Sequence, residues 1–254
     1  MATDTVDFLC NVCGHSNEAV PLEQVANREC QTCGSCHSSL RMRSVMRALS
    51  MELYGRTLPV PDFPLDKSIA GLGMSDWEGY SRRLEQKFSY VNTYYHVEPK
   101  LDITRVADTM LGRYRFLISS DVFEHIPGFG LDSAFRNARR LLKPGGAFIF
   151  TVPYEKSGET REHFPRLLDF RIIETGGKRY LYNKTVDGAE EIYDQLVFHG
   201  GEGMTLEMRM FTEPDLLRRL RSAGFSSVRV CADHEPKFGV IWPMDWAVPI
   251  VARA

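Results

Sequence analysis

The sequence predicts an α/β fold, with a mostly parallel, doubly wound sheet preceded by a small cysteine-rich unit. Three observations support this prediction. Strand-like and helix-like segments alternate from about residue 66 to the end of the chain. A helical apolar stripe is stopped by Pro144 and two glycines and is followed at once by a buried strand-like run. Five of the six cysteines lie between residues 10 and 36.

The bulk composition is that of a globular protein with one full core and an appendage. The chain has 254 residues, of which 43% are hydrophobic and 25% are charged. Its net charge of −2 gives no overall attraction to nucleic acid, so we do not expect a nucleic-acid partner. No apolar run approaches the roughly 18 residues that span a bilayer, and residues 1–7 lack the pattern of a signal peptide. We therefore expect a cytoplasmic protein with no membrane partner.

The clustered cysteines form overlapping Cys-x-x-Cys knuckles. These are Cys10-x-x-Cys13, Cys30-x-x-Cys33 and Cys33-x-x-Cys36. Four thiolates from two knuckles can close a tetrahedron around Zn²⁺, and a reducing compartment favours a metal site over disulfides. The sequence therefore predicts a structural zinc, with free thiols or a redox or iron role as the alternatives. Five thiols compete for four places, and His15 and His37 nearby are expected on the surface.

Residues 41–53 predict an amphipathic helix, because apolar residues recur at positions 42, 45, 46, 49 and 53. Arg41, Arg43 and Arg47 are expected on the opposite side. This helix would dock the cysteine unit on the main domain. Alternatively, its arginine face would bind phosphate or carboxylate.

The first strands of the main domain carry candidate ligand-binding positions. Residues 68–73 form a strand with the glycine turn Gly71-x-Gly73, which lets the backbone approach a ligand closely. A helix follows, for which Ser75-x-x-Glu78 would be the capping box. The strand at 90–97 precedes Glu98, where doubly wound folds place an acid on ribose hydroxyls. A third strand is expected at 101–104, too close to the second for an intervening helix.

The later elements follow the same alternation. We expect a strand at 115–119, a helix over 131–142, a strand at 147–152, a loose insertion from about 153 to 209, a helix over 212–223 and strands at 227–231 and 247–252.

Taken together, several motifs resemble those of class I S-adenosylmethionine-dependent methyltransferases over residues 66–254. They are Gly71-Leu72-Gly73, Glu98, Asp102, the loop at 120–125 and Lys143-Pro144-Gly145-Gly146. The resemblance implies a Rossmann-like methyltransferase sheet, mostly parallel with an antiparallel last strand. It also implies S-adenosylmethionine as the cofactor.

The cysteine segment resembles that of a bacterial group of such enzymes associated with glycan or natural-product biosynthesis. In this chain, Cys33-Gly34-Ser35-Cys36 precedes Arg41-Met42-Arg43 as it does in that group. The resemblance favours Cys33 and Cys36 as zinc ligands beside Cys10 and Cys13, with Cys30 as the spare thiol. It implies a zinc-knuckle subdomain and linker helix over residues 1–57, and a methyltransferase domain over 66–254 with an insertion at about 154–209.

The resemblance also assigns cofactor positions. Gly71 and Gly73 would flank the methionine part, Glu98 would hold ribose, Asp102 with its neighbour Ile103 would meet adenine, and Ser120 and Asp121 would line the cofactor. One departure is Ile69, since such enzymes usually carry an acid there that helps to hold the ammonium group of the cofactor.

Methyl transfer is an in-line displacement, so the protein aligns the nucleophile and removes its proton if it is an alcohol. His125, at the carboxyl edge of the sheet, and His163, in the insertion, are the candidate bases. The alternative for each is a structural role. No Asn/Asp-Pro-Pro-Tyr loop follows the strand at 115–119, which disfavours nucleobase and glutamine substrates.

These features predict a methyltransferase acting on a small molecule, on an oxygen of a sugar or secondary-metabolite acceptor. An alternative is an RNA methyltransferase that uses its zinc knuckle as a clamp, supported by Arg41, Arg43 and Arg47. A second alternative is a non-catalytic, methyltransferase-like binding module, supported by Ile69.

Overall fold

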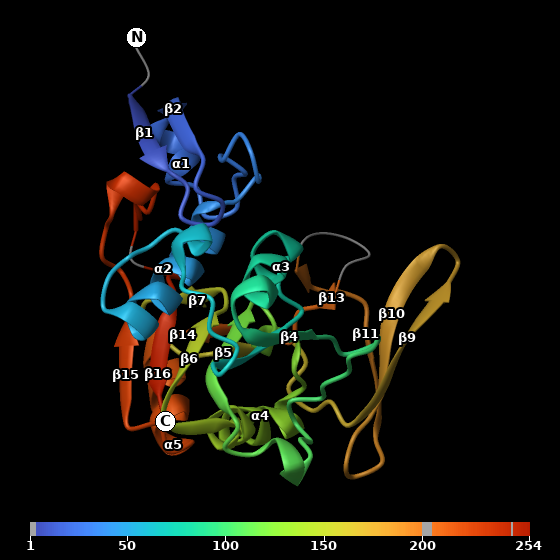
Figure 1. Ribbon diagram of the computed structural model, residues 1–254. Helices are drawn as coiled ribbons and strands as arrows, with labels where there is room; N and C mark the ends of the chain where they lie inside the picture. Colours follow the sequence, from blue (N-terminus) through green and yellow to red (C-terminus); the bar gives the residue numbers. More distant parts are fainter. Residues whose placement is uncertain (1–3, 200–204, 245) are drawn as a thin grey trace.

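The computed structural model describes residues 4–199, 205–244 and 246–254 and is built around a six-stranded sheet (Figure 1). The strand order is β15-β16-β6-β5-β3-β4. The strands are β3 (Ala70–Met74), β4 (Ser89–Thr93), β5 (Tyr114–Ser120), β6 (Leu142–Thr151), β15 (Ser227–Val230) and β16 (Ile250–Arg253).

The directions of these strands confirm the predicted sheet. Strands β4, β3, β5 and β6 are parallel to one another, whereas the last strand, β16, runs antiparallel to both β6 and β15. The chain leaves β3 toward β4 on one side and later returns to β5 on the other. The gap between the carboxyl ends of β3 and β5 is therefore the topological switch point, where open α/β sheets bind ligands.

The predicted third strand at 101–104 is wrong. Among the described residues the sheet ends at β4, and beyond it the structure has an isolated bridge between Tyr94 and Lys100. The physical reason is local: Oδ1 of Asp102 accepts hydrogen bonds from the backbone N–H of Thr104 at 2.9 Å and from its hydroxyl at 2.7 Å. An Asx turn of this kind competes with an extended strand.

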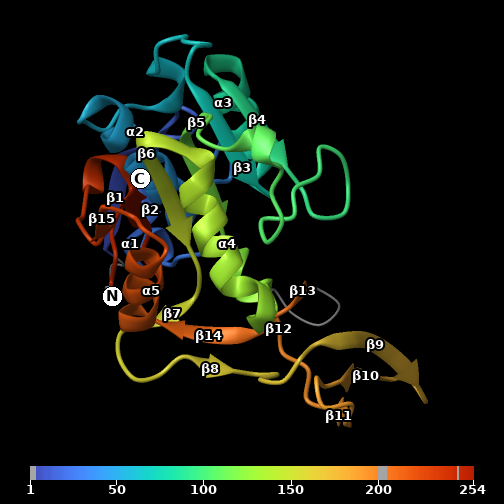
Figure 2. The same ribbon diagram turned by 90° about the horizontal axis from the view of Figure 1, so that it is seen from below.

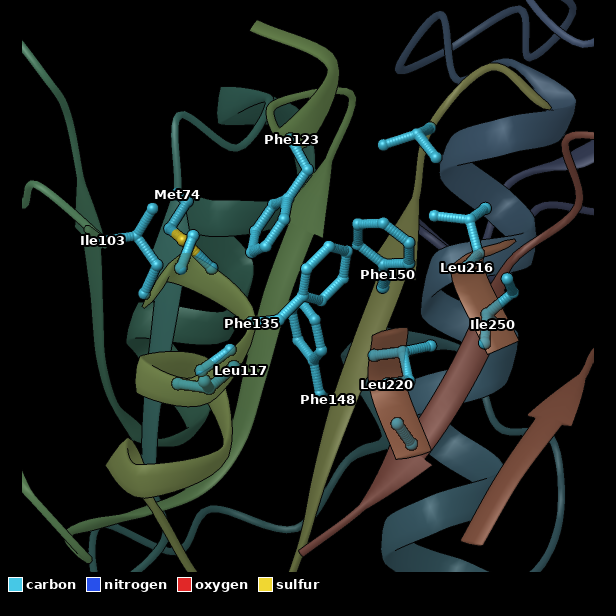
Figure 3. Packing of buried hydrophobic residues seen from close by; sticks show 14 of the residues in the cluster. Met74, Ile103, Leu117, Phe123, Phe135, Phe148, Phe150, Leu216, Leu220 and Ile250 are labelled. Atoms are coloured by element: carbon cyan, nitrogen blue, oxygen red, sulfur yellow. The ribbon is translucent and has the colours of Figure 1, made fainter. Parts of the chain in front are cut away.

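Two pairs of helices cover the two faces of the sheet (Figure 1). Helices α2 (Leu40–Tyr54) and α3 (Glu78–Lys87) cover one face, and α4 (Gly128–Leu141) and α5 (Glu213–Ser222) cover the other. Figure 3 shows the core under α4, where Phe123, Phe135, Phe148 and Phe150 pack in tilted and edge-to-face contacts with ring centroids 4.8–5.9 Å apart. This aromatic packing anchors the loop after β5 to the sheet.

Helix α3 begins later than its sequence suggests, so the capping box at Ser75 is wrong. The residue before the helix is Trp77. Ser75 instead adopts a left-handed backbone with φ 55°, and its N–H donates to the carbonyl of Thr93 at 2.7 Å. The chain turns sharply at the end of β3 and buries Asp76 before the helix starts.

The N-terminal segment packs on the same face as α2 and α3. It contains the hairpin β1 (Thr5–Leu9) and β2 (Ser16–Pro21) and the short helix α1 (Leu22–Val25). Phe8 and Val12 belong to the same buried cluster as Phe116 and Ile149 of the sheet. The segment predicted to be helical forms α2, whose buried residues pack in the same cluster as Phe8 and Val12.

In its described residues, the region after β6 forms two further small sheets and a two-stranded pair. An arm built from β9 (Asp169–Thr175), β10 (Lys178–Lys184) and β11 (Glu190–Tyr193) extends away from the body (Figure 2). The remaining strands are β7 (Tyr154–Glu155), β8 (Arg161–Glu162), β12 (Phe198–His199), β13 (Thr205–Leu206) and β14 (Arg209–Thr212). Single 3₁₀ turns are η1 (Val60–Asp62), η2 (Asp108–Met110), η3 (Phe123–His125) and η4 (Pro236–Phe238).

Within the described ranges, every helix is too short or too polar to cross a lipid bilayer.

Candidate functional site

The structure brings four of the six cysteines together. The sulfur atoms of Cys10, Cys13, Cys33 and Cys36 all lie within 4.8 Å of one another. Two of the separations are 3.7 Å, from Cys10 to Cys36, and 3.6 Å, from Cys13 to Cys33. A tetrahedron with Zn–S bonds of about 2.3 Å has sulfur–sulfur edges of about 3.8 Å, so this quartet fits a Zn²⁺ ion. Cys30 lies outside the quartet.

A buried arginine lies beside the cysteine quartet. Arg43 is completely buried, which corrects its expected place on the exposed side of α2. Its guanidinium donates to the carbonyls of Ser38 at 2.7 Å and Gly239 at 3.1 Å and to the hydroxyl of Thr32 at 2.9 Å, and it covers the ring of Phe8. Burial lowers its pKa to about 10, while the nearby cysteines act in the opposite direction. A buried cation here would offset the negative charge of thiolates that hold a metal.

Two arginines from the N-terminal segment hold the carboxyl end of β5. Arg28 forms a two-point ion pair with Asp121, at 2.9 Å from Nη1 to Oδ2 and 2.6 Å from Nη2 to Oδ1. Arg41 donates from Nη1 to the hydroxyl of Ser120 at 2.7 Å, and its Nε lies 3.2 Å from Oδ2 of Asp121. The hydroxyl of Thr151 also donates to Asp121, at 3.0 Å. The two predicted cofactor residues of this loop are therefore part of a charged network.

The strand ends at the switch point have an unusual backbone. Asp121, directly after β5, has φ 56°, and Ser75, directly after β3, has φ 55°. Non-glycine residues are uncommon in this left-handed region, at a cost of roughly 1–3 kcal/mol each, and they concentrate at ligand sites. Both residues lie at the edge where the fold places a ligand.

A buried acid lies next to the glycine turn. Asp76 is 3% exposed and accepts hydrogen bonds from the hydroxyls of Tyr80, at 2.8 Å, and Tyr90. Burial raises the pKa of Asp76 to about 7, although both tyrosine hydroxyls and the charge of Arg41 oppose the shift. Asp76 therefore keeps its proton to a higher pH than an exposed aspartate does.

The two glycines of β3 are required for a reason that the sequence did not reveal. A Cβ on Gly71 would lie 2.2 Å from the ring of Phe116, and a Cβ on Gly73 would lie 1.9 Å from the hydroxyl of Tyr90 and 2.3 Å from Oδ2 of Asp76. The protein's own side chains therefore fill the space beside both glycines.

The other predicted cofactor residues lie in the segment after β4. Glu98 is exposed, and Oε2 accepts the backbone N–H of Lys100 at 3.0 Å. Asp102 is half-buried, with its carboxylate oriented by Thr104. The side chain of Ile103 is buried in the main core (Figure 3), so a ligand would meet its backbone.

The structure places both candidate bases against one segment of the insertion. Nδ1 of His125 lies 2.9 Å from the carbonyl oxygen of Leu206. Nε2 of His163 lies 3.0 Å from Oε1 of Glu207, and its backbone N–H donates to the carbonyl of Met208 at 2.8 Å. The two histidines, 38 positions apart in the sequence, thus share the same supporting strand end.

A second buried acid lies beneath His125. Glu124 is fully buried, and its Oε1 lies 3.8 Å from Nε2 of His125. Burial, reinforced by the charge of Asp121, raises the pKa of Glu124 well above its ordinary value. Glu124 is therefore held in its neutral form more readily than an exposed glutamate.

Sequence reasoning missed several groups of this site. Arg28 has no motif around it, and its partner Asp121 lies 93 positions away. Glu207 is likewise 44 positions from His163. The position of Asp76 after the glycine turn was the one available signal, because chain that follows the first strand of such a sheet meets the ligand edge.

No protein-family model matches this sequence, and no curated protein matches it. Similar solved structures include a 1,6-didemethyltoxoflavin-N1-methyltransferase from Burkholderia thailandensis, at 16% identity, 82% coverage of this chain, 77% coverage of that one and a TM-score of 0.44. An amino pentose methyltransferase from Micromonospora echinaspora is 11% identical, with 85% coverage of this chain, 92% coverage of that one and a TM-score of 0.45. A sugar N-methyltransferase from Streptoalloteichus sp. is 11% identical, with 82% coverage of this chain, 84% coverage of that one and a TM-score of 0.44. Because these TM-scores are low, the assignment of the fold depends on the sheet topology of this chain and not on the similar structures.

Proposed function

We propose that this protein is an S-adenosylmethionine-dependent methyltransferase acting on an oxygen of a small acceptor, a sugar or a secondary metabolite. The observation that carries the proposal is the polar loop of Ser120 and Asp121 at the switch point of a parallel sheet whose last strand, β16, is antiparallel. This combination is what the resemblance of the sequence motifs implies. The fold alone does not specify chemistry, which depends on the residues of the site.

The residues at this edge fit the proposed cofactor. We assign the contacts to ribose and adenine to Glu98, Asp102 and the backbone of Ile103, and the contacts near the methionine part to the strand ends after Gly73 and Ser120. Support comes from the fixed carboxylate of Asp102 and from the strained residues Ser75 and Asp121 at the two strand ends. Gly71 and Gly73 shape the strand by admitting the aromatic rings behind it. The cofactor would supply an electrophilic methyl group on a sulfonium sulfur.

We assign proton removal from the acceptor to the histidine pair. The carbonyl of Leu206 can only accept, so the proton of His125 lies on Nδ1 and the lone pair on Nε2. The carboxylate of Glu207 favours a proton on Nε2 of His163, which leaves Nδ1 to accept a proton. Glu207 would orient His163, as the third residue of a catalytic triad orients the general base in other enzymes. His163 is the first candidate because the side chain of Glu207 holds its ring in place.

We further propose that the cysteine quartet holds a structural Zn²⁺. The donor set supports this, since four sulfurs at tetrahedral spacing leave no open position for substrate. We retain residues 1–57 as the zinc-knuckle subdomain with its linker helix and 66–254 as the methyltransferase domain, with the insertion at about 154–209. A cytoplasmic location is part of the proposal, because thiols stay reduced there.

The arrangement of the arginines argues against the RNA alternative. Arg43 is buried, Arg41 bonds to the site residues Ser120 and Asp121, and Nε of Arg47 lies 2.6 Å from Glu235. The arginine face expected to contact RNA is therefore used within the protein. A clamp on RNA needs cations that face solvent.

A transfer assay tests the proposal. Zinc-loaded protein is incubated with methyl-tritiated S-adenosylmethionine and, separately, sugar nucleotides, hydroxylated secondary metabolites and bulk RNA. We expect label in at least one small hydroxylated acceptor, and retention of that label after conditions that cleave methyl esters. Label in RNA alone would replace the small-molecule proposal. Cofactor binding without transfer to any acceptor class would favour the non-catalytic module.

A further inference from the structure

Arg28 and Arg41 converge on one point at the switch-point edge. Their side chains are 14% and 17% exposed, and both contact Asp121, which is 6% exposed. One inner carboxylate therefore faces two guanidinium groups. A partly buried arginine pair with a single counter-ion leaves one positive charge to be matched by another anion.

The second counter-charge is Glu29. Its carboxylate accepts from Nε of Arg41 at 2.9 Å and from Nη2 at 2.7 Å, and it also bonds to Nη1 of Arg28. Within the described part of the chain, the carboxylate of Glu29 bonds to these two arginines. The side chain of Glu29 is 51% exposed, so it covers the pair from the solvent side.

The two arginines, by contrast, are fixed independently of Glu29. Arg28 donates from Nε to the carbonyl of Ala247 at 3.2 Å and makes its two-point contact with Asp121. Arg41 is held by Ser120. The backbone N–H of Arg41 also donates to the carbonyl of Arg28 at 3.1 Å. None of these bonds involves Glu29, so they can hold the arginine fork in place when Glu29 moves away, as a preorganised binding site requires.

We propose that Arg28 and Arg41 form an anion subsite for a ligand carboxylate or phosphate, which Glu29 occupies in the ligand-free protein. The side chain of Glu29 is half exposed, whereas both arginines are held by other partners, so Glu29 is the member of the cluster that can exchange with a ligand anion. A planar guanidinium fork binds carboxylate and phosphate through paired hydrogen bonds. The arginines would attract the ligand and Glu29 would limit its affinity.

Two sources can supply this anion. Building on the proposed function, the first is the carboxylate at the methionine end of the cofactor, because the subsite lies at the carboxyl end of β5 beside β3. The second is an anionic group on the acceptor, such as the phosphates of a sugar nucleotide. Both share the chemistry that the arginine fork recognises.

Calorimetric titration of Glu29→Gln separates these sources. Three probes are used: S-adenosylhomocysteine, 5′-methylthioadenosine, which lacks the amino-acid part, and inorganic pyrophosphate. Removing the competing charge should tighten the binding of the subsite's ligand by about three- to tenfold. A gain for S-adenosylhomocysteine without a gain for methylthioadenosine assigns the subsite to the cofactor. A gain for pyrophosphate alone assigns it to the acceptor.

Two controls make the test specific. Glu23→Gln removes an exposed carboxylate from α1 of the same segment and should change none of the three affinities. Arg41→Ala should weaken the ligand identified by Glu29→Gln by about tenfold or more. Unchanged affinities for all three probes in Glu29→Gln, or equal gains for S-adenosylhomocysteine and methylthioadenosine, would overturn the subsite. Failure of wild-type protein to bind either nucleoside would instead refute the proposed function, while the pyrophosphate titration would still test the subsite.

Discussion

Arg28 and Asp121 join the cysteine segment to the ligand edge of the sheet through two hydrogen bonds, of 2.9 and 2.6 Å. The segment between Arg28 and Arg41 contains Cys33 and Cys36, so one short stretch of chain contributes both to the sulfur quartet and to the switch point. The N-terminal segment is therefore a structural part of the candidate site.

Loss of the charge on Asp121 should destabilise the protein. Asp121→Asn keeps a residue that tolerates the left-handed backbone but leaves Arg28 and Arg41 with less counter-charge. We expect the free energy of unfolding to fall by about 2–4 kcal/mol in denaturant titration. Asp132→Asn is the control, since Asp132 is 70% exposed in its pair with Arg219, and it should cost under about 0.5 kcal/mol. Equal effects of the two changes would contradict a special role for the Arg28–Asp121 pair.

Substitution of a quartet cysteine and substitution of Cys30 should have different effects on zinc content and stability. Cys33→Ser should abolish stoichiometric zinc in purified protein and lower the melting temperature by about 10 °C, because metal binding contributes directly to folding. Cys30→Ser should keep one zinc per chain and the wild-type melting temperature. Zinc is measured by atomic absorption. Loss of zinc in Cys30→Ser with retention in Cys33→Ser would reverse the ligand assignment.

The buried acid Asp76 should make stability depend on pH. Its pKa is about 7 in the folded protein and about 4 when unfolded. The unfolded state therefore loses this proton first, and the contribution of Asp76 to the free energy of unfolding falls as pH rises from about 4 to about 7, then stays constant. Asp76→Asn should remove this slope from unfolding curves measured between pH 5 and 8. Asp62→Asn, at an exposed position, should keep it, and an unchanged slope in Asp76→Asn would refute the account.

The proposed base should affect turnover and leave cofactor binding intact. His163→Gln should lower kcat by about 10²–10⁴-fold, the usual contribution of general base catalysis. Glu207→Gln should lower it less, because it removes only the orienting charge. The exposed His234→Gln is the matched control and should turn over normally. Wild-type kcat in His163→Gln, accompanied by a loss in His125→Gln, would transfer the role to His125.

The sequence allowed prediction of features that depend on nearby residues. The main strands of the sheet and the end of a helix shortly before Pro144 follow from short-range patterns, and the structure contains them. The cysteine knuckles also follow from spacing, whereas the choice of Cys33 and Cys36 over Cys30 came from the resemblance. The third strand failed because the hydrogen bonds of Asp102 to Thr104 outweigh a β-like composition. This is a local competition that residue types alone do not rank.

Long-range partners explain the remaining differences. The position of Arg43 in the helical pattern suggested exposure. Its guanidinium is instead buried and donates a hydrogen bond to the carbonyl of Gly239, 196 positions away. The role proposed for Glu207, like that for Arg28, depends on a partner that is distant in the sequence. Helical periodicity predicts which face is apolar, and it carries no information about a charged side chain that finds a buried partner elsewhere.

Calorimetric titration of the zinc-loaded protein with S-adenosylhomocysteine tests the central claim most directly. We expect binding in the micromolar range by wild type, weakening by about tenfold or more in Asp102→Ala, and no change in Asp108→Ala, whose side chain in the same connecting segment is 93% exposed. Absence of binding by folded wild-type protein would contradict the account. Equal binding by wild type and Asp102→Ala would contradict the assignment of the adenine site.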